Sequence, residues 1–141
     1  MCIRDRAEAV GLSPSPCLQR VKRLEKAGFI ECYRARINIG KLTESVMIFT
    51  EVTLSDHRKD DFQKFEREIR KIDNLQEMHL ISGGYDYLLK FTVRNMLHYQ
   101  DIISDVLEKN IGVSKYFSYI VIQTLLDRGY VPIKALTRKD I

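Results

Sequence analysis

The sequence contains no tryptophan, only three prolines and three cysteines, and no long run of apolar residues. Cys2, Cys17 and Cys32 show neither a CxxC motif nor Cys/His ligand spacing, and their odd number argues against a disulfide framework. No apolar run approaches the roughly 18 residues of a membrane span, and no signal-peptide pattern opens the chain. We therefore expect a protein of the reducing cytoplasm with no membrane partner.

Catalytic and metal-binding motifs are also lacking. His57, His79 and His98 have no metal-ligand spacing. No nucleophile, base and orienting group can be assembled from the serines, cysteines and histidines of the sequence. We expect neither a metal site nor a cofactor, and we do not expect an enzyme.

The segment that follows residue 12 has the features of a short helix with defined ends. Ser13 is a suitable N-cap, and Pro14 and Pro16 fall in the first turn, where backbone N–H groups lack partners within a helix. Gly28 follows the last turn and is a common helix stop. A helix is predicted here from local chemistry alone.

This predicted helix has an apolar side and a basic side. At 100° per residue, Cys17, Val21 and Leu24 lie on one side. The opposite side is polar and basic, and comprises Ser15, Gln19, Lys22 and Lys26, flanked by Arg20 and Arg23. For an isolated helix, the simpler explanation is an ordinary solvated face.

The distribution of charge favours a nucleic-acid contact over that explanation. Residues 1–36 contain eight Lys and Arg against four Asp and Glu, a net charge of +4, whereas the other 105 residues contain 15 of each sign. Lys and Arg neutralise phosphates and supply much of the non-specific affinity for DNA. A short helix predicted over residues 7–12 and ended by Gly11 completes the order helix, turn, helix, in which the second helix enters the major groove.

A strand is predicted after Gly28, where Ile30, Cys32 and Arg34 alternate with Glu31, Tyr33 and Ala35. This strand would be the wing of a winged helix-turn-helix DNA-binding domain over residues 1–40. Lys26, Arg34 and Arg36 are expected to contact phosphates, whereas Gln19 suits adenine and Arg23 suits guanine or phosphate. The full set of candidate DNA contacts is Ser13, Ser15, Gln19, Arg20, Lys22, Arg23, Lys26, Arg34 and Arg36.

Residues 41–141 are predicted to form a second, α+β domain. Strands are expected over residues 46–54, 75–81, 87–93 and 113–122, with helices over 56–72 and around residues 99–107. The order βαββαβ is that of a ferredoxin-like fold, an antiparallel sheet with both helices on one face. A strand-like segment is expected over residues 131–136, before a frayed C-terminal end.

The other face of such a sheet needs a cover. We assign Phe49, Leu89 and Phe91 to it, and these side chains would otherwise lie in water. A second subunit is the expected cover, so the chain should form at least a homodimer.

A glycine-containing turn joins two of the predicted strands and is the best candidate for a small-molecule site. Its residues are Ser82, Gly83, Gly84, Tyr85 and Asp86. Backbone N–H groups freed by the glycines suit a carboxylate, and the Asp86 carboxylate suits an ammonium group, so the pair matches an amino-acid zwitterion. An ordinary hairpin turn, with the aspartate accepting from a turn N–H, explains the same residues.

Two stretches carry a family resemblance. Residues 10–30, VGLSPSPCLQRVKRLEKAGFI, resemble the helix-turn-helix of the Lrp/AsnC family, the leucine-responsive or feast/famine regulators of bacteria and archaea. Residues 75–93, LQEMHLISGGYDYLLKFTV, resemble the effector domain of that family, so the resemblance covers about residues 7–136. It implies an amino-acid pocket at the Gly/Asp turn where dimers meet, with His79 and Tyr119 nearby, and dimers that join into tetramers, octamers or open spirals.

The sequence departs from the family at its beginning. Family members begin with a longer first helix, whereas only residues 1–6, MCIRDR, precede the match, and we interpret these six residues as foreign to the pattern. Val10, Leu12, Val21 and Leu24 would then lose a packing partner, at about 1.5 to 3 kcal/mol for each uncovered large side chain. We expect an incomplete DNA-binding half that frays.

The leading hypothesis is a sequence-specific transcription regulator that binds double-stranded DNA and responds to an amino acid such as leucine. One alternative is an oligomer that binds the amino acid but no longer binds DNA. Another is an enzyme similar to the sirohaem decarboxylases, which share this architecture. A tetrapyrrole pocket should gather His and Arg, whereas His79 stands alone near the predicted site.

Overall fold

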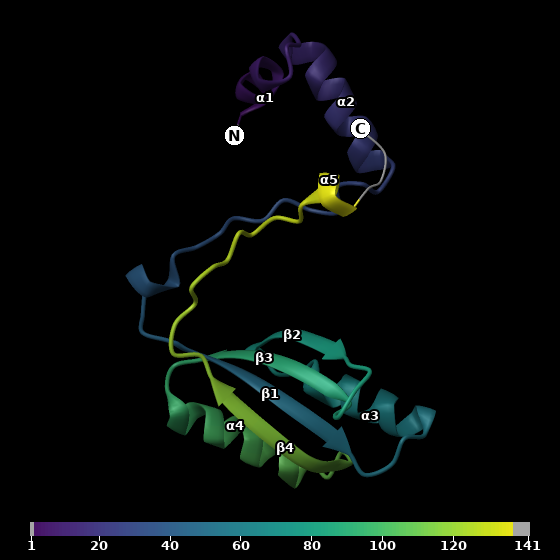
Figure 1. Cartoon of the computed structure of the whole chain (residues 1–141), viewed down its shortest axis with the longest axis vertical. Coiled ribbons are helices and arrows are strands. Elements are labelled where there is room, and N and C mark those ends of the chain that lie inside the picture. The colour runs from purple at the N-terminus through teal and green to yellow at the C-terminus, as the bar shows by residue number, and fades with distance from the viewer. Residues whose placement is uncertain (1, 137–141) are drawn as a thin grey trace. The chain divides into compact units, whose positions relative to one another are not determined.

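The computed structural model describes residues 2–136 and consists of two compact units (Figure 1). The first unit extends to Asn38, and the second begins at Ile39. None of the helices within the described range combines the length and apolar character needed to cross a bilayer.

The first unit contains helices α1 (Ile3–Ala9) and α2 (Pro14–Lys26). Helix α2 begins and ends as predicted, and the Ser13 backbone occupies the N-cap position, although the Ser13 side chain makes no capping hydrogen bond. Gly28 has a φ of +76°, a left-handed conformation that glycine adopts without a steric penalty. The predicted range of the first helix, residues 7–12, was wrong, because the helix begins at Ile3 and ends at Ala9. Residues 3–6 therefore belong to the helical pair.

The strand predicted after Gly28 does not form. Residues 30–38 lie outside any helix or strand, since a strand requires a neighbour to share its backbone hydrogen bonds, and no such pairing forms within the described part of this segment. Tyr33 fixes the segment instead. Its hydroxyl donates to Glu25 Oε1 of α2 at 2.7 Å, and the Arg6 guanidinium of α1 lies 5.4 Å from its ring centre.

The second unit has the predicted βαββαβ order (Figure 1). After a 3-10 turn, η1 (Ile39–Lys41), its elements are β1 (Val46–Leu54), α3 (Lys59–Ile69), β2 (Leu75–Leu80), β3 (Tyr87–Val93), α4 (Met96–Glu108) and β4 (Val113–Ile120). The strands pair antiparallel in the order β2-β3-β1-β4, which places β1 and β3 at the centre. The α+β fold class is therefore confirmed.

Helices α3 and α4 cover one face of this sheet (Figure 1). Helix α3 is shorter than the predicted range of residues 56–72, because Ser55 to Arg58 form the connection that follows β1. The side chain of Asn95 caps α4 by accepting a hydrogen bond from the His98 backbone N–H at 2.9 Å.

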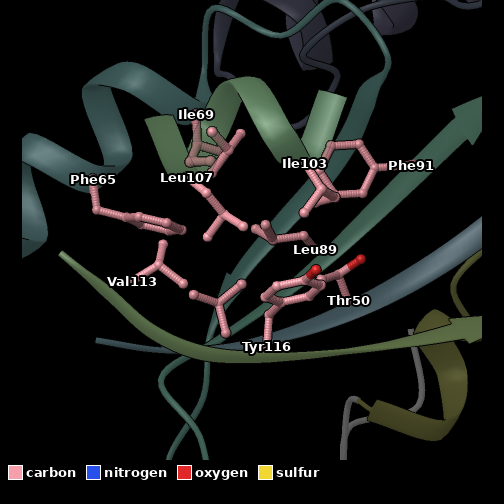
Figure 2. Close-up of a pocket in the computed structure, with 11 residues that line it drawn as sticks. Thr50, Phe65, Ile69, Leu89, Phe91, Ile103, Leu107, Val113 and Tyr116 are labelled. Atoms are coloured by element: carbon pink, nitrogen blue, oxygen red, sulfur yellow. The ribbon is translucent and has the colours of Figure 1, made fainter. Parts of the chain in front are cut away.

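The core lies between the helices and the sheet, and alternate residues of the central strands point into it (Figure 2). Leu89 and Phe91 belong to this core and are almost fully buried, so their assignment to the open face was wrong. Their β1 neighbours in register are Thr50 and Ile48, which also face the helices. Phe49 faces the other way, as predicted, because side chains alternate along a strand.

The last described segment contains a short helix, α5 (Ile133–Leu136), rather than the strand-like segment predicted for residues 131–136. Pro132 sets up this turn, since proline fixes φ near the helical value and its carbonyl accepts from the Ala135 N–H at 2.9 Å. The predicted frayed end, residues 137–141, lies outside the described residues.

Candidate functional sites

The basic side of α2 is exposed along its whole length. The helix buries only Cys17, with Val21 half-buried beside it, which leaves the opposite side to solvent. The exposed side chains predicted to contact DNA from this helix and its N-cap are Ser13, Ser15, Gln19, Arg20, Lys22, Arg23 and Lys26. One helix thus presents cationic and amide side chains together, and an α-helix fits into the major groove of DNA.

Arg20 lies apart from this basic side. With Arg6 it flanks a groove of about 340 Å³ between α1 and α2, whose apolar lining includes Val10, Val21 and Leu24. Val10 is 62% exposed and Leu24 is 43% exposed, so the groove is an apolar surface open to water within the first unit. Arg20 therefore belongs with the rim of the groove more closely than with Lys22 and Lys26.

Arg34 and Arg36 lie in the extended segment that Tyr33 ties to α2, and both are exposed. They follow the C-terminal end of α2, where no wing strand forms. Solvent reaches both side chains, and their placement depends on a connecting segment rather than on a hairpin.

The glycine-containing turn lies between β2 and β3 and is closed by a hydrogen bond from the Ile81 N–H to the Asp86 carbonyl at 2.8 Å. Neither Gly83 nor Gly84 has a positive φ. A Cβ on Gly84 would meet no atom within 4 Å, and one on Gly83 would meet only Ile81 Cγ2 at 3.8 Å. The conformation and packing of the described chain therefore do not require glycine at either position.

Asp86 is held firmly at the junction of three strand ends. Its Oδ2 atom accepts from the Leu54 backbone N–H at 2.7 Å, and its own N–H donates to the Val52 carbonyl at 3.0 Å. Both carboxylate oxygens also lie 3.1 Å from His57 Nε2. The turn predicted from sequence is correct in position, and the Asp86 carboxylate is bonded to the end of β1.

Tyr119 of β4 and Glu51 of β1 lie near each other on the open face of the sheet, since Tyr119 pairs with Phe49 and Glu51 pairs with Phe117. The Glu51 carboxylate and Tyr85 lie close enough to the Tyr119 phenol to act on it electrostatically. Partial desolvation, the Glu51 charge and the neighbouring Tyr85 raise the pKa of the Tyr119 phenol above its ordinary value of 10.0, so this group stays protonated and can donate.

His79 belongs to a separate cluster on β2. Its Nε2 atom lies 3.3 Å from Glu77 Oε2, and Lys90 Nζ of β3 donates to the other oxygen of Glu77 at 2.7 Å. Hydrogen bonds from Lys90 and His79 lower the pKa of Glu77 below its ordinary value. The structure thus places Tyr119 near Glu51, and places His79 with Glu77 and Lys90.

The internal cavity of the second unit is too small for an amino acid. It measures about 10 Å³, enough for one water molecule at most, and apolar side chains such as Phe65, Leu89 and Val113 line it (Figure 2). A small molecule would therefore bind at the surface of this unit rather than in its core.

Sequence reasoning missed two residues at these sites. His57 was considered only as a metal ligand and given no other role, although it pairs with Asp86 29 positions away. Glu51 was treated only as part of a strand. Its alternation with Thr50 and Val52 was the available signal that it faces away from the helices. Nothing local in the sequence indicates the partner of His57.

Comparison with known proteins identifies the type of domain in each unit. The family model described as the Lrp/AsnC ligand binding domain matches residues 47–131, and the model described as winged helix-turn-helix DNA-binding matches residues 1–31. The second match spans residues 1–31 only, and the interpretation of residues 1–6 as foreign to the pattern stays a prediction. Neither model describes an enzyme, and the curated relatives that the chain matches are regulatory proteins, which argues against the decarboxylase alternative.

Curated proteins and solved structures give the same assignment. The chain is 39% identical over 128 residues to the leucine-responsive regulatory protein of Escherichia coli strain K12, an alignment that covers 91% of this chain and 78% of that protein. A Neisseria meningitidis transcriptional regulator, solved as a complex with L-Met, is 28% identical with a TM-score of 0.89, covering 97% of this chain and 88% of that one. An AsnC family transcriptional regulator from Agrobacterium tumefaciens shares the fold, with a TM-score of 0.89 at 23% identity over 97% of this chain and 89% of that one. On this evidence the chain belongs to the Lrp/AsnC family of DNA-binding transcriptional regulators, with an amino-acid effector domain after its helix-turn-helix.

Proposed function

We propose that the protein regulates transcription by binding specific DNA sequences through α2, and that an amino acid bound at the second unit alters this binding. One observation carries the first part: the matched helix-turn-helix contains a fully exposed basic helix face in a segment that holds the whole net charge of the chain. The similarity to a leucine-responsive protein and to a regulator solved with L-Met supports the second part.

Within α2, Gln19 and Arg23 are proposed to contact base edges, and Lys22 and Lys26 are proposed to contact phosphates. Ser13 and Ser15 lie at the N-terminal end of the helix, the end that approaches the bases in helix-turn-helix complexes. Arg20, Arg34 and Arg36 are proposed as peripheral phosphate contacts.

Substitution of single side chains on α2 tests these roles. Lys26→Ala should weaken binding to specific and scrambled DNA alike and reduce the slope of log affinity against log salt concentration by about one. Gln19→Ala should instead weaken binding to specific DNA by about 1 to 3 kcal/mol and leave binding to scrambled DNA unchanged. Lys59→Ala removes an exposed charge from α3 and is the matched control. Selective loss at one base pair in Lys26→Ala would contradict the phosphate role.

The effector is proposed to be an α-amino acid with an apolar side chain, such as leucine or methionine, bound at Ser82 to Asp86. The turn is exposed, and the open space beside Gly83 and Gly84 leaves room for a ligand or a second subunit. The backbone N–H groups of the turn suit the carboxylate of the ligand, and the Asp86 carboxylate suits its ammonium group. Tyr85 and Tyr119 are proposed to border the pocket, with His79 at its far edge.

The open face of the sheet is proposed to form the homodimer contact, with dimers joining into tetramers or octamers. This face carries Met47, Phe49, Leu88, Phe117 and Tyr119. Phe117 is 56% exposed and Tyr119 is 51% exposed, and large aromatic side chains on one face of a sheet favour burial against another subunit. Equilibrium sedimentation of Phe117→Glu beside the unchanged protein tests this assignment, because a charge in the contact should shift the dimer toward monomer.

One observation favours a second candidate, an effector-binding oligomer that does not bind DNA. The groove between α1 and α2 leaves Val10 and Leu24 exposed, which deprives the helical pair of packing energy. A chain that assembles and binds an amino acid, yet fails to bind any DNA at low salt, would establish this candidate.

A further inference from the structure

His57 is bonded to the group proposed to receive the ammonium of the ligand. Its Nε2 atom lies 3.1 Å from both oxygens of Asp86, and the Asp86 side chain is only 18% exposed. The connection between β1 and α3 therefore places an imidazole N–H donor against a carboxylate that belongs to the turn between β2 and β3.

The imidazole ring is held on one side and open on the other. Its centre lies 5.8 Å from the ring of Phe62, which in turn lies 6.0 Å from the ring of Tyr87 in the core. The His57 side chain is nevertheless 57% exposed. A group in this position is aligned by packing, and a competing cation can displace it without opening the core.

Little of the Asp86 carboxylate remains for a ligand while His57 is in place. The Leu54 N–H donates to Oδ2, and His57 Nε2 lies within hydrogen-bond distance of both oxygens. We infer that His57 is the resident partner of Asp86, a positioning and specificity residue that the ammonium group of the amino acid must displace. This inference rests on the proposed function of the turn.

The displacement makes effector binding depend on pH. A protonated imidazole competes with an ammonium group more strongly than a neutral one, and histidine gains its charge near neutral pH. The charged and titratable groups around the ring are Asp86 of the turn, Asp56 and Arg58 of its own segment, and Tyr87 of β3. Glu66 of α3 and Arg70, the C-cap residue of that helix, act on Tyr87. Acid conditions should therefore favour the pair of His57 and Asp86 and lower the affinity for the amino acid.

Calorimetric titration of the full chain with L-leucine and with L-methionine, at about pH 6 and about pH 8, measures this competition. Both ligands stay zwitterionic across that range, so their own charge does not change. Affinity of the unchanged protein should fall about threefold to tenfold at the lower pH. His57→Gln keeps a neutral donor but cannot gain charge, so its affinity should not change with pH. His98→Gln, at the start of α4, is the matched histidine control and should keep the dependence.

A pH dependence as steep in His57→Gln as in the unchanged protein would overturn the competition. A second readout, independent of any ligand, is the amide chemical shift of Leu54, which reports on the Asp86 carboxylate. This shift should show a step between about pH 6 and about pH 8 in the unchanged protein, and His57→Gln should lose that step. A step that persists in the variant would overturn the pairing itself. Absence of amino-acid binding in every variant, with the Leu54 step present, would overturn the proposed effector site and uphold the pair.

Discussion

Thr50, Tyr99 and Ser118 form a chain of hydroxyl groups that joins α4 to two strands. The Tyr99 hydroxyl lies 2.7 Å from Thr50 Oγ1 and 2.5 Å from Ser118 Oγ. Thr50 is fully buried and Tyr99 is 3% exposed, so both hydroxyls depend on each other for hydrogen bonds. Burial raises the pKa of the Tyr99 phenol, which keeps it protonated and able to donate.

Tyr99→Phe should lower the free energy of unfolding by about 1 to 3 kcal/mol, because it leaves the buried Thr50 hydroxyl without a partner. Thr50→Val in the same chain removes that unpaired group and should restore part of the loss. Urea unfolding of the two single variants and the double variant measures both effects. Strictly additive losses would contradict the direct contact.

Gly83 and Gly84 do not have the positive φ at which the backbone favours glycine. Gly83→Ala should change the free energy of unfolding by no more than about 0.5 kcal/mol, because its φ is ordinary and its neighbour is 3.8 Å away. The same substitution should weaken amino-acid binding, because the added methyl group occupies the proposed ligand space.

Gly112→Ala supplies the control for this comparison. Gly112 has a φ of +89°, so alanine there should destabilise the fold by about 1 kcal/mol or more without a direct effect on the ligand. If Gly83→Ala bound the amino acid as tightly as the unchanged protein, the turn would not be the effector site.

At the scale of elements, helix α2 and all four strands could be predicted, because each depends on local signals. Pro14, Pro16 and Gly28 mark the ends of α2, and alternation of side chains marks β1 and β3. The wing strand was predicted after Gly28 but does not form, because a strand depends on a pairing partner that the sequence pattern does not reveal. Asp86 shows the same limit. Its position in the turn could be predicted, but its hydrogen bonds to Leu54 and His57 could not, because these partners are distant in the sequence.

The pair of Glu77 and Lys90 crosses between β2 and β3, and its contribution should depend on pH. The pKa of Glu77 is lowered from its ordinary value of 4.5, so its stabilising effect is present above that value and disappears as pH falls through the lowered one. Glu77→Gln should therefore destabilise the protein by about 0.2 to 1 kcal/mol at neutral pH. Thermal unfolding at neutral pH and in acid should show this difference shrinking in acid. A constant difference across pH would rule out the charge as its cause.

At the scale of the whole molecule, the two units differ sharply in how much they bury. Within residues 2–38 only Ala7 and Cys17 are buried, whereas the second unit has a continuous core that includes Ile48, Phe65 and Phe91. Because burial of apolar surface stabilises a fold, the second unit should be the more stable of the two against unfolding.

Hydrogen exchange should reproduce this difference. In the free protein, amides of α1 and α2 should exchange faster than those of β1 and β3, because the apolar groove of the first unit adds little protection. Addition of specific DNA should slow exchange in α2. Equal protection of both units without DNA would mean that another surface covers Val10 and Leu24.

The most direct test of the central claim is fluorescence anisotropy on DNA from the upstream region of the gene itself, against scrambled DNA of equal length. Titrations at two salt concentrations, with and without L-leucine or L-methionine, address both units together. We expect salt-sensitive and sequence-selective binding, with an affinity that the amino acid changes by about fivefold or more. Equal affinity for both DNAs, or an affinity that no amino acid changes while one is bound, would contradict a regulator in which the turn at Asp86 controls the helix that contacts DNA.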